Sequence, residues 1–297
     1  MYNPSIKESR GDRAFTFVNY TFLVLVLIMV AYPLLYIVSA SFSNPGKVAA
    51  GEIWLFPKGF NVAGYKAVFD YSRFWTGFTN SLFYTSAGTM LNVTLTVMAG
   101  YVLSRRDLVG RNLFMLLFMF TMLFSGGLIP TYLLVQDLGL INTRWAMILP
   151  TALSVWNLII ARTFFQVSIP QELLEAAQID GCNDFKFVWR IVLPLSAPII
   201  AVLCLFYAVG HWNTYFNALI YLRNKELFPL QIILREILIL NSVDTAMTNG
   251  SEAQAKQALS QLLKFSLVII ASLPILVIYP FVQKHFVKGV MIGSLKG

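Results

Sequence analysis

The sequence predicts an all-α membrane protein with six transmembrane helices. Its 297 residues are 57% hydrophobic and only 12% charged, a balance outside the range of ordinary soluble domains. Six apolar segments are each long enough to cross a hydrocarbon core of about 30 Å, at residues 15–40, 78–104, 112–136, 145–167, 192–222 and 262–284. A β-barrel would need alternating segments of about ten residues, which the sequence lacks, so helices must satisfy the backbone in lipid.

The first segment superficially resembles a secretory signal peptide, because Lys7, Arg10 and Arg13 precede its apolar run. Residues 15–40 exceed the roughly 7–15 residues of a signal-peptide core, so we interpret them as a retained transmembrane helix. This helix, the tail before it and the outer loop after it are expected to form residues 1–77 of the protein. The five later helices form the core domain, residues 78–297.

The distribution of positive charge orients these helices. Twelve Lys and Arg residues lie on the side of the N-terminal tail and ten on the other side, so the totals discriminate weakly. The short loops are more informative, since residues 105–111 hold three arginines and residues 137–145 hold one. Short cytoplasmic loops carry the excess of Lys and Arg, and we therefore expect both termini in the cytoplasm.

A hydrophilic run after the fourth segment predicts a short cytoplasmic helix at residues 169–180. Ser168 suits its N-cap, Pro170 suits its first turn, and Gly181 suits a left-handed end. The centre of the helix consists of two small residues, Ala176 and Ala177. Three acidic residues flank them: Glu172, Glu175 and Asp180. Its surface can approach another protein closely, so the helix is a candidate docking element.

Two of the long segments contain residues that are unusual in a straight apolar helix. In the third, Gly126, Gly127 and Pro130 should kink or unwind the chain. The break is either a packing kink or a hinge that lines a pathway. In the fifth, a polar and aromatic cluster interrupts the helix: His211, Trp212, Asn213, Tyr215 and Asn217.

That cluster suits a saccharide. Aromatic faces stack against sugar rings, and amides bond to hydroxyl groups. The alternative is that these groups hydrogen-bond neighbouring helices and hold them together, and His211 in particular has the character of a packing histidine. Both interpretations stay open at this point.

Several function classes are excluded or disfavoured. The chain has no Gly-rich phosphate loop, and its only histidines are His211 and His285, so we expect no catalytic residues, cofactor or metal site. Cys182 and Cys204 lack metal-ligand spacing. The basic residues are scattered between apolar runs, which disfavours nucleic acid. Because no acidic residue lies near the centre of a span, an ion-coupled secondary transporter is only the alternative function.

The hydrophilic run also carries a family resemblance. Glu175-Ala176-Ala177, three residues, Gly181, nine residues and Ile191-x-Leu193-Pro194 is similar to the EAA motif of permease subunits of bacterial ABC importers. The stretches at 126–130, 210–221 and 288–297 resemble the carbohydrate-importer branch. Within that branch they look most like permeases for alginate and pectin-derived saccharides.

The resemblance implies an importer subunit with a five-helix core, made of the second to sixth segments, and one additional N-terminal helix. A coupling helix at about residues 169–190 would contact the ATPase through the following residues: Glu172, Glu175, Ala176, Ala177, Gly181, Ile191, Leu193 and Pro194. The saccharide path would include the 211–217 cluster with Gly126, Gly127 and Pro130.

The resemblance also implies partners and a location. The expected partners are a second, homologous permease, two ATP-binding subunits that hold ATP and Mg, and an extracytoplasmic solute-binding protein. The subunit would lie in the bacterial inner membrane and move oligosaccharides or polysaccharide fragments, with acidic alginate- or pectin-like ones as candidates, by alternating access.

Overall fold

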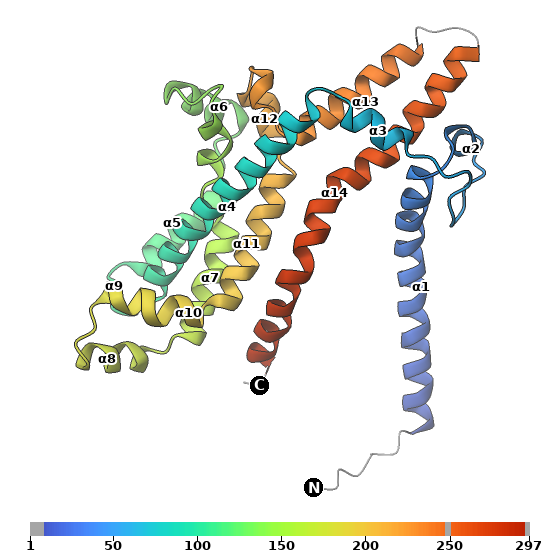
Figure 1. Ribbon diagram of the computed structural model, residues 1–297. Coiled ribbons are helices and arrows are strands. Elements are labelled where there is room, and N and C mark those ends of the chain that lie inside the picture. The colour runs from blue at the N-terminus through green and yellow to red at the C-terminus, as the bar shows by residue number, and fades with distance from the viewer. Residues whose placement is uncertain (1–8, 247–250, 295–297) are drawn as a thin grey trace. The chain divides into compact units, whose positions relative to one another are not determined.

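The computed structural model describes residues 9–246 and 251–294, and side chains at residues 9–239 and 258–280. Within these ranges the chain is helical and contains no strand, which confirms the all-α class (Figure 1). Residues 1–8 and 295–297 lie outside the described residues, so the side of the membrane on which the two termini lie stays a prediction.

The chain forms two compact units. One joins the residues up to Asp70 with Ile237–Ile270, and the other joins Tyr71–Glu236 with the residues from Ala271 onward. The expected division near residue 77 lies close to the first boundary. Residues 237–270 group with the N-terminal residues in the first unit, and the predicted core domain at 78–297 stays a prediction.

The first unit is built on α1 (Arg10–Ser41), α2 (Pro45–Ala49) and α3 (Ala63–Phe69). The N-cap Ser9 and Asp12 bond reciprocally to each other's backbone N–H, which fixes the start of α1. Against the described residues, no residue in the apolar window of α1 is buried, as expected of a helix that faces lipid. A small core closes its far end: Ala40, Val48, Ile53 and Leu262.

The second unit holds the candidate site. Its α-helices are α4 (Phe74–Ser104), α5 (Arg111–Leu123), α6 (Leu128–Asp137), α7 (Val155–Ser168), α8 (Gln171–Ile179), α9 (Asp184–Phe187), α10 (Leu193–Leu195), α11 (Ala197–Trp212) and α12 (Phe216–Tyr221). Two longer helices, α13 (Leu230–Ala246) and α14 (Ser251–Ser294), run into both units. Short 3-10 turns occur at Arg144–Met147, Leu149–Thr151 and Lys225–Leu227, and Val188–Val192 forms a π-helix.

Helix α4 is the centre of this unit and packs along α7 and α11 (Figure 1). Glycines allow the close approaches. A Cβ on Gly88 would come within 2.5–2.8 Å of three ring atoms of His211, and one on Gly100 would come within 3.0 Å of the Ala161 side chain. The hydroxyl groups of Thr96 and Tyr207 are 2.6 Å apart and join α4 to α11. Small residues and buried hydrogen bonds are typical of helix contacts in membranes.

The long apolar segments are less regular than the sequence indicates. Among the described residues three helices could cross a membrane alone, or up to six if each of three bent pairs is one span. The bends are 113° between α5 and α6, 52° between the 3-10 turns and α7, and 78° at the start of α11. Continuous helices over residues 145–167 and 192–222 are therefore wrong in detail, while the count of six stays a prediction.

Two of the bends have local causes. Gly127 adopts a φ of +87° in the connection after α5 and directs the chain into α6, so the expected break at the third segment is confirmed and is larger than a kink. Pro194 lacks an N–H, and Pro198 lies in the first turn of α11. These two bends therefore lie beside residues that interrupt the hydrogen bonding of a regular helix.

Candidate functional site

Helix α8 occupies the hydrophilic run that the sequence singles out. It begins at Gln171, two residues later than expected. Pro170 is the N-cap residue, and its side chain makes no capping hydrogen bond. The expected cap by Ser168 is wrong, since that residue is the last of α7. The left-handed end is confirmed, with Gly181 at a φ of +72°. Cys182 N–H donates to the Ala177 carbonyl at 2.9 Å and Gly181 N–H to the Gln178 carbonyl at 3.0 Å, which is a Schellman motif.

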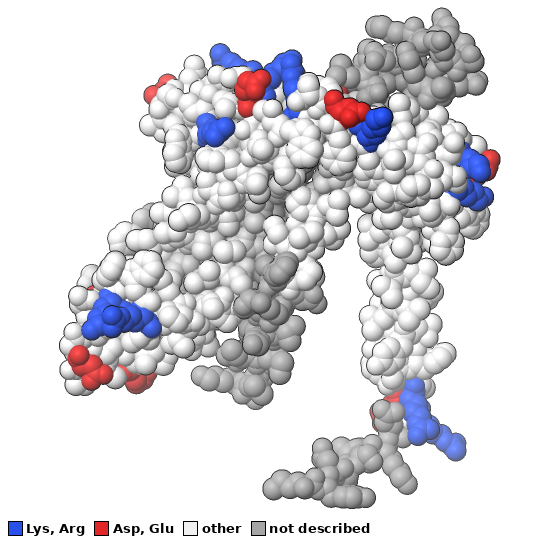
Figure 2. Space-filling model, in the orientation of Figure 1, with Lys and Arg blue, Asp and Glu red and all other residues white. Residues whose placement is uncertain are grey.

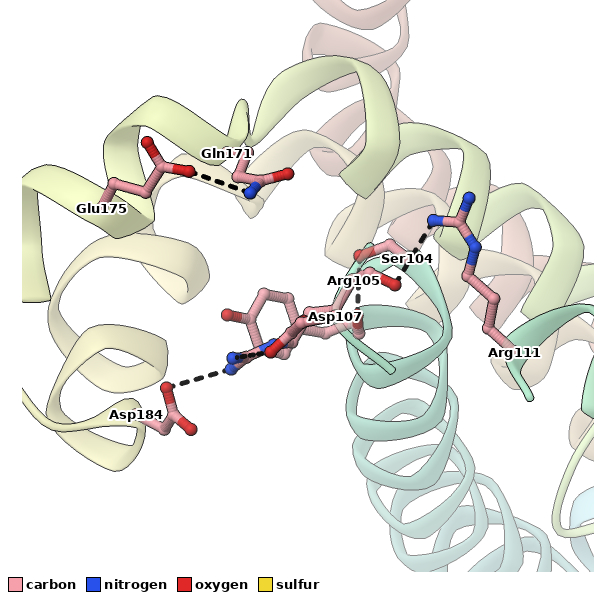
Figure 3. A network of polar contacts seen from close by, with 8 residues as sticks. Ser104, Arg105, Asp107, Arg111, Gln171, Glu175 and Asp184 are labelled. Atoms are coloured by element: carbon pink, nitrogen blue, oxygen red, sulfur yellow. Dashed lines mark hydrogen bonds and ion pairs between the residues drawn. The ribbon is translucent and has the colours of Figure 1, made fainter. Parts of the chain in front are cut away.

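The two alanines of α8 face opposite ways. Ala177 is buried, and it belongs to an apolar cluster that contains Phe187 and Phe165. Ala176 is exposed and shares one helical face with three other exposed residues: Glu172, Glu175 and Ile179. The side chain of Glu175 accepts a hydrogen bond from Gln171 Nε2 at 2.9 Å (Figure 3). Ala177 thus anchors α8 to the unit, while Ala176 lies in its outward face.

The residues after α8 continue this exposed surface. Ile191 and Leu193 pack against the apolar cluster, whereas Pro194 is exposed. Phe185 and Trp189 are 74% and 60% exposed, with ring centroids 6.1 Å apart. The sequence analysis missed these two aromatics, although large aromatic residues inside a hydrophilic connection are the signal that could have found them.

An open cavity of about 750 Å³ lies beside α8, between it and the loop that follows α4. Its lining is mostly charged or polar, and the loop arginines Arg105, Arg106 and Arg111 face Glu172, Glu175 and Gln178 across it. Figure 2 shows that on the face in view the charged side chains of this unit gather near the ends of its long helices, and the middle is uncharged. The charged end that includes α8 is therefore separated from the apolar middle.

The candidate saccharide cluster divides into a buried and an exposed part. His211 is buried over Gly88, with Nε2 3.2 Å from the amide nitrogen of Asn92. Trp212 is buried too, and its indole N–H donates to the Ala271 carbonyl at 2.8 Å. In this conformation both side chains have the contacts expected of residues that hold helices together.

Asn213, Tyr215 and Asn217 lie at the break between α11 and α12. Asn213 is exposed, and the other two are half-buried. The guanidinium of Arg235, itself exposed on α13, lies 5.3 Å from the centre of the Tyr215 ring. The phenol ring and the cation thus come together at one helix break, and Arg235 is a third residue that sequence reasoning missed.

The two glycines and the proline of the third segment contribute no hydrogen-bonding side chain to the candidate pathway. Gly126, Gly127 and Pro130 are exposed at the α5–α6 break. The helix after the break contacts the far end of α12, because the Tyr132 ring stacks on that of Tyr221 with 6.3 Å between the ring centroids. Among the described residues no group of three His, Cys, Asp or Glu side chains is placed to hold a metal ion.

Comparisons with known proteins decide the family. A model of the family described as binding-protein-dependent transport system inner membrane component matches residues 92–292. The chain belongs to this family. An inner membrane component is a transport subunit of an ABC importer, so the expected class of protein and its place in the inner membrane are confirmed, and the helices described above are those of an ABC permease.

Two of the proteins similar to this chain belong to polysaccharide transport systems. This chain is also 45% identical to protein LplC of Bacillus subtilis (strain 168), over 99% of this chain and 98% of the relative. It is 42% identical to YtcP of the same organism, a polygalacturonan/rhamnogalacturonan transport system permease protein, over 96% of this chain and 99% of the relative. A chain in the crystal structure of a bacterial ABC transporter involved in the import of the acidic polysaccharide alginate is 31% identical, with a TM-score of 0.83, over 95% of this chain and all of that one.

Proposed function

We propose that this permease imports acidic oligosaccharides or polysaccharide fragments and is driven by ATPase subunits that dock on α8. The proposed docking on α8 rests on the outward face of this helix, where the small Ala176 lies with Glu172 and Glu175, and on the exposed rings of Phe185 and Trp189 in the segment that follows. An exposed apolar patch with a charged rim is typical of a protein interface.

In this proposal the partners divide the work. Two ATP-binding subunits hold ATP and Mg, a second homologous permease completes the pathway, and an extracytoplasmic solute-binding protein delivers the saccharide. The α8 side and both termini face the cytoplasm. Closure of the ATPase pair favours one permease conformation and the loaded binding protein favours the same one, so both bias a single two-state element. An ion-coupled transporter, the alternative function, is not favoured by a family defined by dependence on binding proteins.

Substitutions at Gly181 distinguish two possible requirements of ATPase docking: a surface without a side chain, or the left-handed backbone turn alone. Its φ of +72° strains most side chains, yet an added Cβ meets no atom within 4 Å. Asparagine tolerates the left-handed region well, whereas alanine costs about 1 kcal/mol there. If docking needs a bare surface, Gly181→Asn is expected to reduce ATP-driven uptake more than Gly181→Ala.

The measurement is uptake into vesicles by complexes purified to equal ATPase content, with thermal stability of each variant as the control for folding. The opposite ranking, with Gly181→Asn active and Gly181→Ala impaired, would show that the left-handed turn matters and the bare surface does not.

The proposal that the cargo is an acidic saccharide rests on Arg235 and on the relatives. The permeases most informative about cargo act on polygalacturonan/rhamnogalacturonan and on alginate, which carry carboxylates. In this chain the Arg235 guanidinium lies over the Tyr215 ring, and Asn213 and Asn217 are each two residues from Tyr215 in the sequence. A planar cation suits a sugar carboxylate, and the ring and amides suit the rest of the sugar.

Arg235→Gln is expected to lower uptake of an acidic oligosaccharide about tenfold relative to its neutral methyl ester, because a hydrogen bond to a charged group is lost. Uptake of both saccharides is measured with saturating loaded binding protein, which removes differences in delivery. The matched control is Arg223→Gln, which removes an exposed cation just before the 3-10 turn at Lys225–Leu227. It should leave the ratio of acidic to neutral saccharide uptake unchanged. An equal loss for both saccharides, or none, would remove Arg235 from the pathway.

A further inference from the structure

One guanidinium joins three separate segments beside α8. Arg105 is the residue that ends α4, and its side chain is 17% exposed. Its Nε and Nη2 donate to the two carboxylate oxygens of Asp107 at 2.9 and 2.6 Å, and its Nη1 donates to Asp184 at 3.0 Å. Figure 3 shows the fork of Arg105 between the two acids. The end of α4 is thereby tied to α9, which follows α8.

The bidentate pair with Asp107 fixes the plane of the guanidinium. Two parallel N–H···O bonds leave little freedom to rotate, so the remaining Nη1 is held toward Asp184. Asp184 has a fixed position as well, because it begins α9 and the preceding residue, Asn183, caps that helix through a 2.8 Å bond to the Lys186 N–H. The contact between Arg105 and Asp184 is therefore made by two groups that are both already oriented.

An apolar contact reinforces the tie. Tyr101 lies one turn before Arg105 and packs its ring against Phe165 of α7 at 5.9 Å and Phe187 of α9 at 6.5 Å. Ala177 of α8 belongs to the same cluster. The end of α4 thus contacts both α8 and α9, through a core on one side and a charged network on the other.

The network remains charged under physiological conditions. The hydrogen bond to Asp107 raises the pKa of Arg105, and the same hydrogen bond lowers the pKa of Asp107. Asp107 has its lowered pKa only in the folded state, so its contribution is present above its ordinary pKa and is lost as the pH falls through the lowered value. Near neutral pH the fork is intact.

We propose that Arg105 is a positioning residue that transmits the movement of α8 and α9 to α4. This inference rests on the proposed docking of an ATPase at α8. A force applied to α8 reaches α9 through the four residues between them, Asp180–Asn183, and the guanidinium carries it from α9 to the helix against which α7 and α11 pack. Without the fork, the coupling segment moves while α4 follows incompletely, and ATP is hydrolysed without transport.

The test is the number of ATP molecules hydrolysed per saccharide imported, measured with the complete complex in vesicles. Arg105→Ala is expected to raise this ratio about threefold to tenfold, and Asp184→Asn to raise it in the same direction. Because both act through one contact, the double variant should be no worse than Arg105→Ala alone. Arg106→Ala removes the neighbouring exposed cation, which forms no ion pair among the described residues, and should leave the ratio unchanged.

Other outcomes overturn the inference. Unchanged ratios in assembled Arg105→Ala and Asp184→Asn complexes, or single effects that multiply in the double variant, would show that the fork has no role in coupling. If Arg105→Ala fails to assemble, Asp184→Asn decides alone, since this nearly isosteric change lies on an exposed side chain. Failure of the unmodified complex to couple uptake to ATP would contradict the proposed function itself, and the two failures are thus distinguishable.

Discussion

Replacing Ala176 with arginine is expected to abolish ATP-driven uptake while leaving the permease folded. Ala176 is exposed on the outward face of α8, so the new side chain can extend along that face, toward Glu172, without entering the core of the unit. On the docked surface the long cation would either hold the two proteins apart or be buried between them, which costs several kcal/mol. Since every 1.4 kcal/mol is tenfold in affinity, uptake should fall at least about tenfold. The measurement is uptake together with ATPase recovered on purification of the permease.

The adjacent alanine provides the matched control. Ala177 is buried in the cluster with Phe187, so Ala177→Arg places the same charge inside the unit and should destabilise the permease itself. The two variants differ by one position and are expected to fail in different ways: loss of the ATPase for the first and loss of folded permease for the second. If Ala176→Arg binds ATPase and transports normally, the outward face of α8 is not the docking surface.

Gly88→Ala is expected to destabilise the permease by about 1–2 kcal/mol. The added Cβ would lie within 2.5–2.8 Å of three atoms of the buried His211 ring, and overpacking of this kind costs roughly 1–3 kcal/mol. The gain in helix propensity from Gly to Ala is about 1 kcal/mol and offsets only part of that cost. Thermal unfolding of the purified permease measures the net effect.

Two further variants test whether the His211 ring causes this loss of stability. Gly210→Ala in α11 adds a Cβ that meets nothing within 4 Å, so it should be neutral or stabilising. In a His211→Ala background the space above Gly88 is empty, and Gly88→Ala should then cease to destabilise. A loss of stability from Gly88→Ala that persists without the imidazole would contradict the packing described for α4 and α11.

The features that sequence predicts well here are those fixed by local chemistry. Gly181 ends α8 in a left-handed turn because glycine, which has no Cβ, adopts a positive φ without strain. Gly127 and Pro130 likewise mark a break in the third segment. The family motif at 175–194 identifies the importer class because its residues and spacing are specific, whatever the surrounding packing.

The features that sequence misses depend on distant neighbours. The difference between buried Ala177 and exposed Ala176 is set by which face of α8 meets Phe187. Trp212 is buried because Ala271 of α14 accepts its indole N–H, whereas Asn213, one residue later, is exposed. No local pattern gives the 113° angle between α5 and α6, since a glycine permits a turn and the packing of both helices sets its size.

The most direct measurement of the central claim is site-specific cross-linking of position 176 to the ATPase. A single cysteine replaces Ala176 in a permease whose Cys182 and Cys204 are changed to serine. It is labelled with a maleimide–benzophenone reagent, and light then inserts the benzophenone into a C–H bond of whichever protein lies next to it in the assembled complex. The account predicts a permease–ATPase product from position 176 and none from a cysteine at the exposed Lys225, near the other end of the second unit. Equal products from both positions, or none from position 176 in a complex that transports, would contradict it.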